Sequence, residues 1–210
     1  MPVACCPGDR QQATGNLQLS LIAVGHLPAD AVAPLVETFE RLEVLELDVP
    51  PRDDLAAHRA ELNRAVDAAA NDWIVIVRER ESVADALGAE IAEAVSAAKA
   101  WGFRIRTVPL YAGKPLRIGS QAGELRLFHR RHFLRRGEMG VQGTVVRLNG
   151  ALTAVTFASA DEHRDHLART AVPHSALRRT LIFVRNALLI RARDANTLRY
   201  LWIEAAFDHG

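Results

Sequence analysis

The stretch Asn71–Glu81, NDWIVIVRERE, decides the fold class of this chain. Its middle part, Trp73–Val77, is a continuous and largely β-branched apolar run, which is typical of a buried central strand in a parallel sheet. Upstream, the patterns of Leu17–Val24 and Glu43–Val49 also predict strands, and a helical pattern follows each of the three strands. This alternation of strands and helices predicts an α/β layer built on a mostly parallel sheet.

The organisation changes after this alternating part. Short strands separated by glycine-containing turns are expected at Phe103–Leu110, Gly123–Phe128, Thr144–Leu148 and Leu152–Phe157. Two helices are expected to close the chain, at about Ser175–Ala192 and Ala195–Phe207. We therefore expect a disordered tail at 1–16, an α/β domain at 17–170 and a C-terminal helical segment at 171–210.

The composition is that of an ordinary globular protein, with 49% hydrophobic and 24% charged residues in a chain of 210. The two cysteines, Cys5 and Cys6, are adjacent and cannot join distant segments, which favours a reducing compartment. No apolar run approaches the roughly 20 residues of a membrane span, and the N-terminus lacks the apolar core of a signal peptide. We therefore expect a cytoplasmic protein.

Charge and motifs exclude several classes of function. A net charge of +1 and a few scattered aromatic residues argue against a nucleic-acid partner. The chain also lacks the glycine-rich loops of P-loop kinases and Rossmann oxidoreductases, and the Gly-x-Ser-x-Gly turn of α/β hydrolases.

Four motifs, taken in their order along the chain, resemble a known family. Asn63 lies in a predicted helix, and Asp72-Trp73 opens the central strand. A Gly-Lys-x-x-Arg-x-Gly stretch then occupies Gly113–Gly119, and Arg-Leu-Phe occupies Arg126–Phe128. Over roughly Leu17–Asp165, this arrangement is similar to family 2 glycosyltransferases of the GT-A fold, most closely the lipopolysaccharide-core β-glucosyltransferase type. The resemblance implies a GT-A-like, Rossmann-like α/β domain that binds a nucleotide sugar, with a small antiparallel extension and a helical C-terminus.

The resemblance also implies chemistry for which this chain lacks the residues. Such enzymes hold a divalent metal against the donor diphosphate with carboxylates at the end of the central strand, and a further carboxylate is the general base. Where the family has Asp-Ala-Asp-Glu, this chain has Arg78–Glu81, and where the family has Val-His-Glu, it has Val141–Gly143. A histidine common after the last strand is also missing, with Phe157-Ala158 near that place. We therefore expect no divalent metal at this position.

Arginine can take over part of the metal's role, because its guanidinium is a good fork for phosphate oxygens. Arg78 and Arg80 are the candidates to contact the donor diphosphate, and Glu81 is the surviving family carboxylate. If the strand continued through this segment, alternation would direct Glu79 and Glu81 to one side, away from the two arginines.

Three further residues complete the candidate nucleotide-sugar site. Asp48 and Asp54, with Asp53 as another possibility, match the donor-binding Asp-x-x-x-x-Asp turn of the family, although Asp48 is equally compatible with a solvated strand end. The family's additional strand and helix between this turn and the Asn63 helix are absent here. Arg126, in the Arg-Leu-Phe motif, is the third.

These observations support two hypotheses of different classes. The first is a non-catalytic glycosyltransferase-like protein of polysaccharide or envelope glycan synthesis, which binds a nucleotide sugar, a glycan or a glycosyltransferase partner. The second is an active, metal-independent glycosyltransferase that uses Arg78 and Arg80 on the donor diphosphate. Neither hypothesis requires a cofactor, and the sequence identifies no catalytic residue.

Three other clusters have two interpretations each. His163 and His166 share a helical face and could hold a metal, or could belong to an ordinary hydrated helix start. The segment His129–His132 could bind an anion or form a solvated strand edge. The arginine-rich C-terminal helices could lie on an anionic membrane surface or dock a partner, or could pack as ordinary helices with a charged face.

Overall fold

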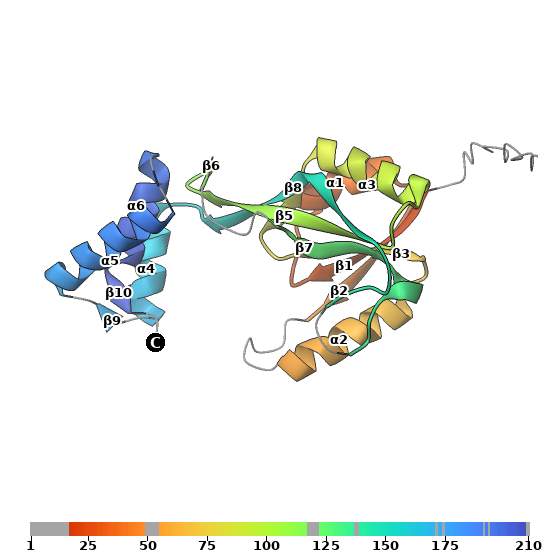
Figure 1. Ribbon diagram of the computed structural model, residues 1–210, viewed down its shortest axis with the longest axis horizontal. Helices are drawn as coiled ribbons and strands as arrows, with labels where there is room; N and C mark the ends of the chain where they lie inside the picture. The colour runs from red at the N-terminus through yellow and green to blue at the C-terminus, as the bar shows by residue number, and fades with distance from the viewer. Residues whose placement is uncertain are drawn as a thin grey trace, which may run out of the picture.

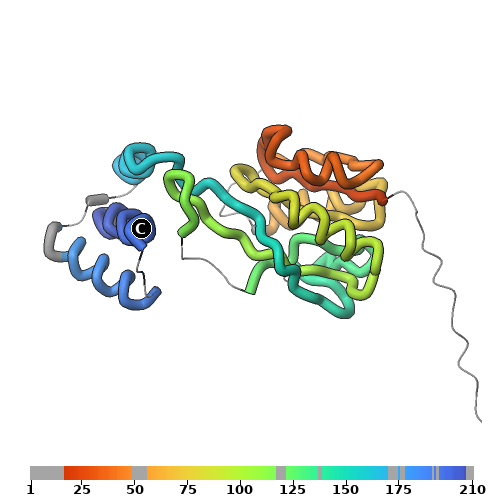
Figure 2. Tube along the Cα trace, turned by 90° about the horizontal axis from the view of Figure 1, so that it is seen from above, coloured from red at the N-terminus to blue at the C-terminus, as the bar shows by residue number. Residues whose placement is uncertain are grey.

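The computed structural model describes residues 17–48, 55–116, 122–136, 139–170, 172–173, 175–190, 192 and 194–208. They form two lobes joined by a narrow arm, with the α/β lobe on the right and a helical lobe on the left (Figure 1). The view from above shows the same separation of the two lobes (Figure 2). The expected tail at 1–16, with Cys5 and Cys6, lies outside the described residues, as do Asp53 and Asp54.

An eight-stranded sheet is the centre of the α/β lobe. Its order is β2-β1-β3-β7-β5-β8-β4, with β6 paired to β5. Strands β2, β1, β3, β5 and β8 run in one direction, whereas β7, β4 and β6 run in the other. The strands are β1 (Gln18–Val24), β2 (Arg41–Leu47), β3 (Trp73–Arg78), β4 (Glu81–Val83), β5 (Gly102–Tyr111), β6 (Lys114–Pro115), β7 (Glu124–His129) and β8 (Val145–Phe157). The expected α/β class with a mostly parallel sheet is confirmed, and β1 and β3 are direct parallel neighbours.

Helices cover both faces of this sheet (Figure 1). One face carries α1 (Ala33–Thr38) and α3 (Asp85–Ala97), and the other carries α2 (Leu55–Ala68). A 3₁₀ turn, η1 (Ala29–Val32), precedes α1, so the first helix is shorter than the sequence pattern suggests. The lobe therefore has three layers and two apolar cores.

Strand β3 shows why a continuous apolar run is needed at the centre. Val75 and Val77 pack into the core beneath α1 and α3, whereas Ile74 and Ile76 pack into the core beneath α2. Successive side chains on a strand point to opposite faces, so a strand buried on both sides has no position for a polar residue. The sequence of Trp73–Val77 meets this requirement.

Strand β8 differs from the sequence prediction. Two strands separated by a turn at Gly150 were expected, but β8 is one strand from Val145 to Phe157, with a shift in its register against β5 between Arg147 and Ala151. The Glu90 carboxylate accepts the backbone N–H groups of Asn149 and Gly150, at 2.8 and 2.7 Å. A Cβ on Gly150 would lie 2.9 Å from Leu87 Cδ1. The glycine therefore allows α3 to approach the strand closely and does not make a turn.

The outer ends of β5 and β8 leave the sheet together as a paired arm. Leu152–Ala154 of β8 still pairs with β4, and beyond it Leu110–Tyr111 of β5 pairs with Val155–Phe157, with β6 hydrogen-bonded to β5. The arm leads to the helical lobe, which contains α4 (Ala160–Thr170), α5 (Ala176–Leu189), α6 (Ala195–Glu204) and a small sheet of β9 (Val172–Pro173) and β10 (Phe207–Asp208).

The helical lobe has a small core of its own. Tyr111 from the arm packs with Ala160 and Leu167 of α4 and Ile203 of α6. The expected boundary at residue 170 falls at the end of α4, whereas α4 packs against α6 on the helical side of the arm. Within the described residues, no helix is long and apolar enough to cross a membrane.

Candidate functional site

The carboxyl ends of three parallel strands meet at one edge of the sheet. Leu47, Val24 and Arg78 are register partners across β2, β1 and β3, so Asp48 and Arg78 both lie at this edge. Two strand spacings separate them, about 10 Å. Strand β7 runs in the opposite direction and begins here with Glu124. This edge is where open α/β sheets bind ligands, and we take it as the candidate site.

A buried ion pair lies behind this edge. The Arg126 side chain is 1% exposed and that of Glu81 is 6% exposed, and Arg126 Nη2 donates to Glu81 Oε1 at 2.7 Å. The other oxygen of Glu81 accepts the backbone N–H of Arg78 at 2.8 Å. Glu81 therefore uses both carboxylate oxygens to join β3 to β7.

Arg126 is held in an environment that disfavours its charge. Burial lowers the pKa of its guanidinium, and the opposing effect of Glu81 offsets only part of that shift. Its Nε and Nη1 groups have no hydrogen-bond partner among the described residues. Unpaired buried donors are costly, so they mark this arginine as a candidate ligand contact or a site of stored strain.

Glu124 connects the buried arginine to the exposed one. Its carboxylate lies 3.0 Å from Arg78 Nη2 and 3.3 Å from Arg126 Nη2. The Arg78 side chain is 45% exposed and that of Glu124 is 49% exposed, so their pair faces solvent. Glu124 could not be selected from local sequence patterns, because its role depends on the register of β7 against β3.

Arg80 lies in a tight turn between β3 and β4. The chain does not continue as a strand here, and Arg80 has a φ of 64°, which is unusual for a residue other than glycine. Its guanidinium donates to the Thr156 carbonyl at 3.2 Å and lies 3.6 Å from Glu162 of α4. Arg80 thus links the α/β lobe to the helical lobe.

This turn corrects the expectation for Glu79 and Glu81. Alternation along a strand would have directed both carboxylates away from the arginines, but the reversal at Arg80 returns Glu81 to Arg126 and to the Arg78 backbone. The simple alternation rule fails because it applies only while the backbone stays extended.

A divalent metal does not fit these residues. Glu81 has no free oxygen, and Glu124 is paired with two arginines. Glu79 is exposed, and its sequence neighbours on both sides are arginines, Arg78 and Arg80. Hard cations require several oxygen ligands. Among the described residues, no group of three His, Cys, Asp or Glu side chains converges on one point.

One part of the resemblance lies away from this edge. The segment Val141–Gly143 lies at the opposite end of the sheet, where Gln142 N–H donates to the His132 carbonyl at 2.7 Å and Val145 pairs with Gly102. The position at which the family would have its base therefore does not adjoin Arg78. Asp54 is outside the described residues, and Gly113–Gly119 is described only as far as Leu116.

The basic segment His129–His132 also lies at that opposite end. Asp72 accepts from Arg130 Nε at 3.1 Å and lies 3.4 Å from Arg131. Burial lowers the pKa of His129 despite the nearby Asp72 carboxylate. His132 stacks on Trp101 with ring centroids 4.0 Å apart. This cluster is built around a carboxylate of the protein itself.

His163 is buried in the helical lobe. Its Nε2 lies 2.9 Å from Glu204 Oε1, and its ring stacks between those of Phe157 and Tyr200. Burial, together with the adjacent Glu204 carboxylate, raises the pKa of Tyr200. His166, on the same helix, is exposed. The contribution of α6 to this cluster comes from about 40 residues away, so the sequence pattern gave no indication of it.

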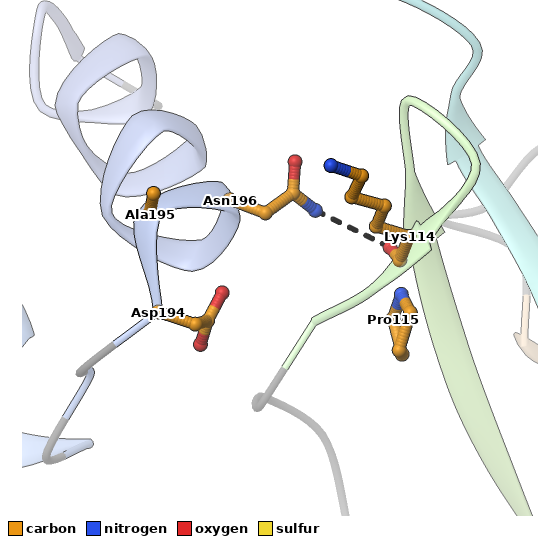
Figure 3. A pocket seen from close by; sticks show the side chains of 5 residues that line it. All are labelled: Lys114, Pro115, Asp194, Ala195 and Asn196. Atoms are coloured by element: carbon orange, nitrogen blue, oxygen red, sulfur yellow. Dashed lines mark hydrogen bonds between the residues drawn. The ribbon is translucent and has the colours of Figure 1, made fainter.

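A pocket of about 420 Å³ lies between the β5–β6 turn and the start of α6 (Figure 3). Asn196 Nδ2 donates to the carbonyl of Lys114 at 3.3 Å across it. Asp194 occupies the helix N-terminus, where its carboxylate accepts the N–H of Thr197 at 2.7 Å. The pocket contains none of the candidate site residues, and its helix end is already capped by an anionic side chain.

Comparisons with known proteins do not assign this chain to a family. No protein-family profile matches the sequence, and no curated protein matches it. Among solved structures, the chain is similar to the bifunctional IspDF from Campylobacter jejuni, with a TM-score of 0.40 and 10% identity. The match covers 63% of this chain and 50% of that one. Similarity of this size establishes neither a shared family nor a shared activity.

Proposed function

We propose that this chain is a glycosyltransferase-like protein of polysaccharide or envelope glycan synthesis. In this proposal it binds a nucleotide sugar at the carboxyl edge of the sheet and does not catalyse metal-dependent transfer. One observation carries the proposal. At the end of β3, where the resemblance implies metal-binding carboxylates, the Arg126 guanidinium binds one oxygen of Glu81 and the backbone N–H of Arg78 binds the other. The side chain of Arg78 is exposed at the same place.

Arg78 and Arg80 are able to exchange their present partners for phosphate. The side chains of both arginines and of their carboxylate partners, Glu124 and Glu162, are more than a third exposed. Exposed ion pairs of this kind contribute only about 0–1 kcal/mol. A diphosphate offers more charge and a bidentate geometry, so it competes well for an exposed guanidinium.

Asp48 supplies a second contact of the right type. Asp48 lies at the same edge as Arg78, with about 10 Å between their backbones across β1. Carboxylates accept hydrogen bonds from hydroxyl groups, as they do from the ribose of bound dinucleotides. This placement favours a ligand whose nucleoside lies near β2 and whose diphosphate lies near β3.

Calorimetric titration tests this proposal. The chain is titrated with nucleoside diphosphates and their sugars in EDTA, and the series is repeated with Mn²⁺. We expect binding that does not require the metal and that falls roughly tenfold or more in Arg78→Ala, because a charged hydrogen bond contributes about 1.5–3 kcal/mol. Arg64→Ala is the matched control, since Arg64 is an exposed arginine of α2, away from this edge.

The outcomes are distinguishable. Absence of binding to every nucleotide tested, or binding that requires Mn²⁺, contradicts the proposal. Donor hydrolysis or transfer in EDTA that Arg78→Ala abolishes identifies the second hypothesis, the metal-independent glycosyltransferase. Arg78→Asp with Arg80→Asp provides a further check, because removing both cations should permit metal binding if the correspondence with the family is correct.

A further inference from the structure

Helix α5 presents apolar side chains away from the protein. Leu181, Leu188 and Leu189 are 63%, 72% and 74% exposed, and Val184 is 46% exposed. Leu181, Val184 and Leu188 follow helical spacing along one stripe of the helix. Isolated exposed apolar residues are common on proteins, but a continuous stripe of large ones marks an interaction surface.

The opposite face of α5 packs against Trp202 of α6. Arg179 lies over the Trp202 ring, with the guanidinium carbon 4.1 Å from the ring centroid, and donates to the Trp202 carbonyl at 3.3 Å. Phe183 meets the same ring edge to face, with centroids 5.2 Å apart. The inward face therefore contacts α6, and the stripe of Leu181, Val184 and Leu188 is directed outward.

The charge on α5 indicates what covers this stripe. Arg178 and Arg185 are exposed and lie along one side of the stripe, between it and Leu189, and the helix contains no acidic residue. An apolar stripe bordered by arginines is the pattern of a helix that lies in the interface of an anionic membrane, where guanidiniums meet phosphate headgroups and leucines enter the acyl boundary. Helix α5 also lies at the outer end of the helical lobe, clear of the α/β lobe (Figure 1).

We infer that α5 docks this chain on an anionic lipid surface, with Leu181, Val184 and Leu188 inserted and Arg178 and Arg185 on the headgroups. This interaction does not depend on the proposed nucleotide site. It uses one face of a single helix, which lies in the plane of the membrane surface and does not cross the membrane.

Vesicle co-sedimentation of the full chain tests the inference. We expect the chain to bind vesicles of phosphatidylglycerol and phosphatidylcholine, and to bind pure phosphatidylcholine much less. Leu181→Glu with Leu188→Glu should reduce binding at least tenfold, because both leucines would carry charge into the acyl boundary. Arg178→Glu and Arg185→Glu should each reduce it by roughly fivefold or more, and added salt should do the same.

A matched double variant controls for general effects of added charge. Val36→Glu with Val44→Glu replaces two exposed valines of the α/β lobe, 58% and 51% exposed, and should leave vesicle binding unchanged. Circular dichroism confirms that each variant is folded.

Three results overturn the inference: no binding of the folded chain to anionic vesicles, equal binding by the leucine variant, or equal binding to phosphatidylcholine. A dimer in solution that the leucine variant dissociates, without vesicle binding, assigns the stripe to a second copy of the chain instead.

Discussion

The two lobes bury their apolar residues in opposite ways. In the α/β lobe, the apolar run of β3 is enclosed on both faces by helices. In the helical lobe, the small core contains Tyr111 with His163 and Tyr200 beside it, while Leu181, Leu188 and Leu189 of α5 face solvent. The α/β lobe therefore encloses its own apolar core, whereas the helical lobe depends on a few polar and aromatic contacts. We expect the two lobes to respond differently to the same kind of substitution.

The largest effect is expected from Arg126→Ala. This substitution leaves the Glu81 carboxylate buried without its charged partner, which costs about 3–5 kcal/mol in free energy of unfolding. Arg126→Met combined with Glu81→Leu should recover most of that loss, since it removes both charges. Chemical denaturation of the three proteins checks this. Similar stability of the single and double variants would show that the pair does not govern this core.

His163→Ala should affect the helical lobe more than the α/β lobe. The side chain is fully buried, stacks on Phe157 and bonds Glu204, so its loss should destabilise the lobe by about 2–4 kcal/mol. His166→Ala, on the exposed side of the same helix, is the matched control.

Fluorotryptophan labelling provides the measurement for His163→Ala. Trp202 reports on the helical lobe, whereas Trp73 and Trp101 report on the α/β lobe. In ¹⁹F NMR spectra recorded with increasing denaturant, the Trp202 signal of the variant should be lost first. Simultaneous loss of all three signals would mean that the lobes unfold as one unit.

Asp194→Ala should have a smaller effect, of about 1 kcal/mol, because it removes the side-chain cap of α6. Ser175→Ala is a control of the same type, since Ser175 precedes α5 but makes no capping hydrogen bond. Thermal unfolding should distinguish the two variants, and equal shifts in Tm would contradict the assignment of Asp194 as the cap.

Leu188→Ala is expected to be nearly neutral in solution, within about 0.5 kcal/mol, because the side chain is mostly exposed. The comparison is Leu201→Ala in α6, whose buried side chain should cost about 2–4 kcal/mol. A large loss of stability in Leu188→Ala would mean that α5 packs inward by its leucines.

Local sequence patterns predicted helices and strands well where the pattern is compatible with only one kind of element. Trp73–Val77 is a central strand, and the last two helices lie within the expected ranges, as α5 and α6. The glycine at position 150 misled the prediction, because a close contact with α3 and a turn both favour glycine.

The candidate site was less accessible to prediction. Arg78 and Arg80 could be selected from the sequence, but the burial of Arg126 and the bridge through Glu124 depend on the pairing of β3 with β7, which are about 50 residues apart. Similarly, the period of α5 revealed an apolar stripe but not the direction in which it faces. Both properties arise from tertiary packing, which a local pattern does not encode.

The arm formed by β5 and β8 has a geometric consequence. Its backbone hydrogen bonds fix the separation of the lobes, and the two or three paired residues beyond β4 correspond to about 10 Å. If α5 rests on a bilayer, the arm acts as a spacer that sets the height of the carboxyl edge above the lipid. A ligand carried on a lipid would then have to extend to that height, so the length of the arm would limit which lipid-linked ligands the edge can contact.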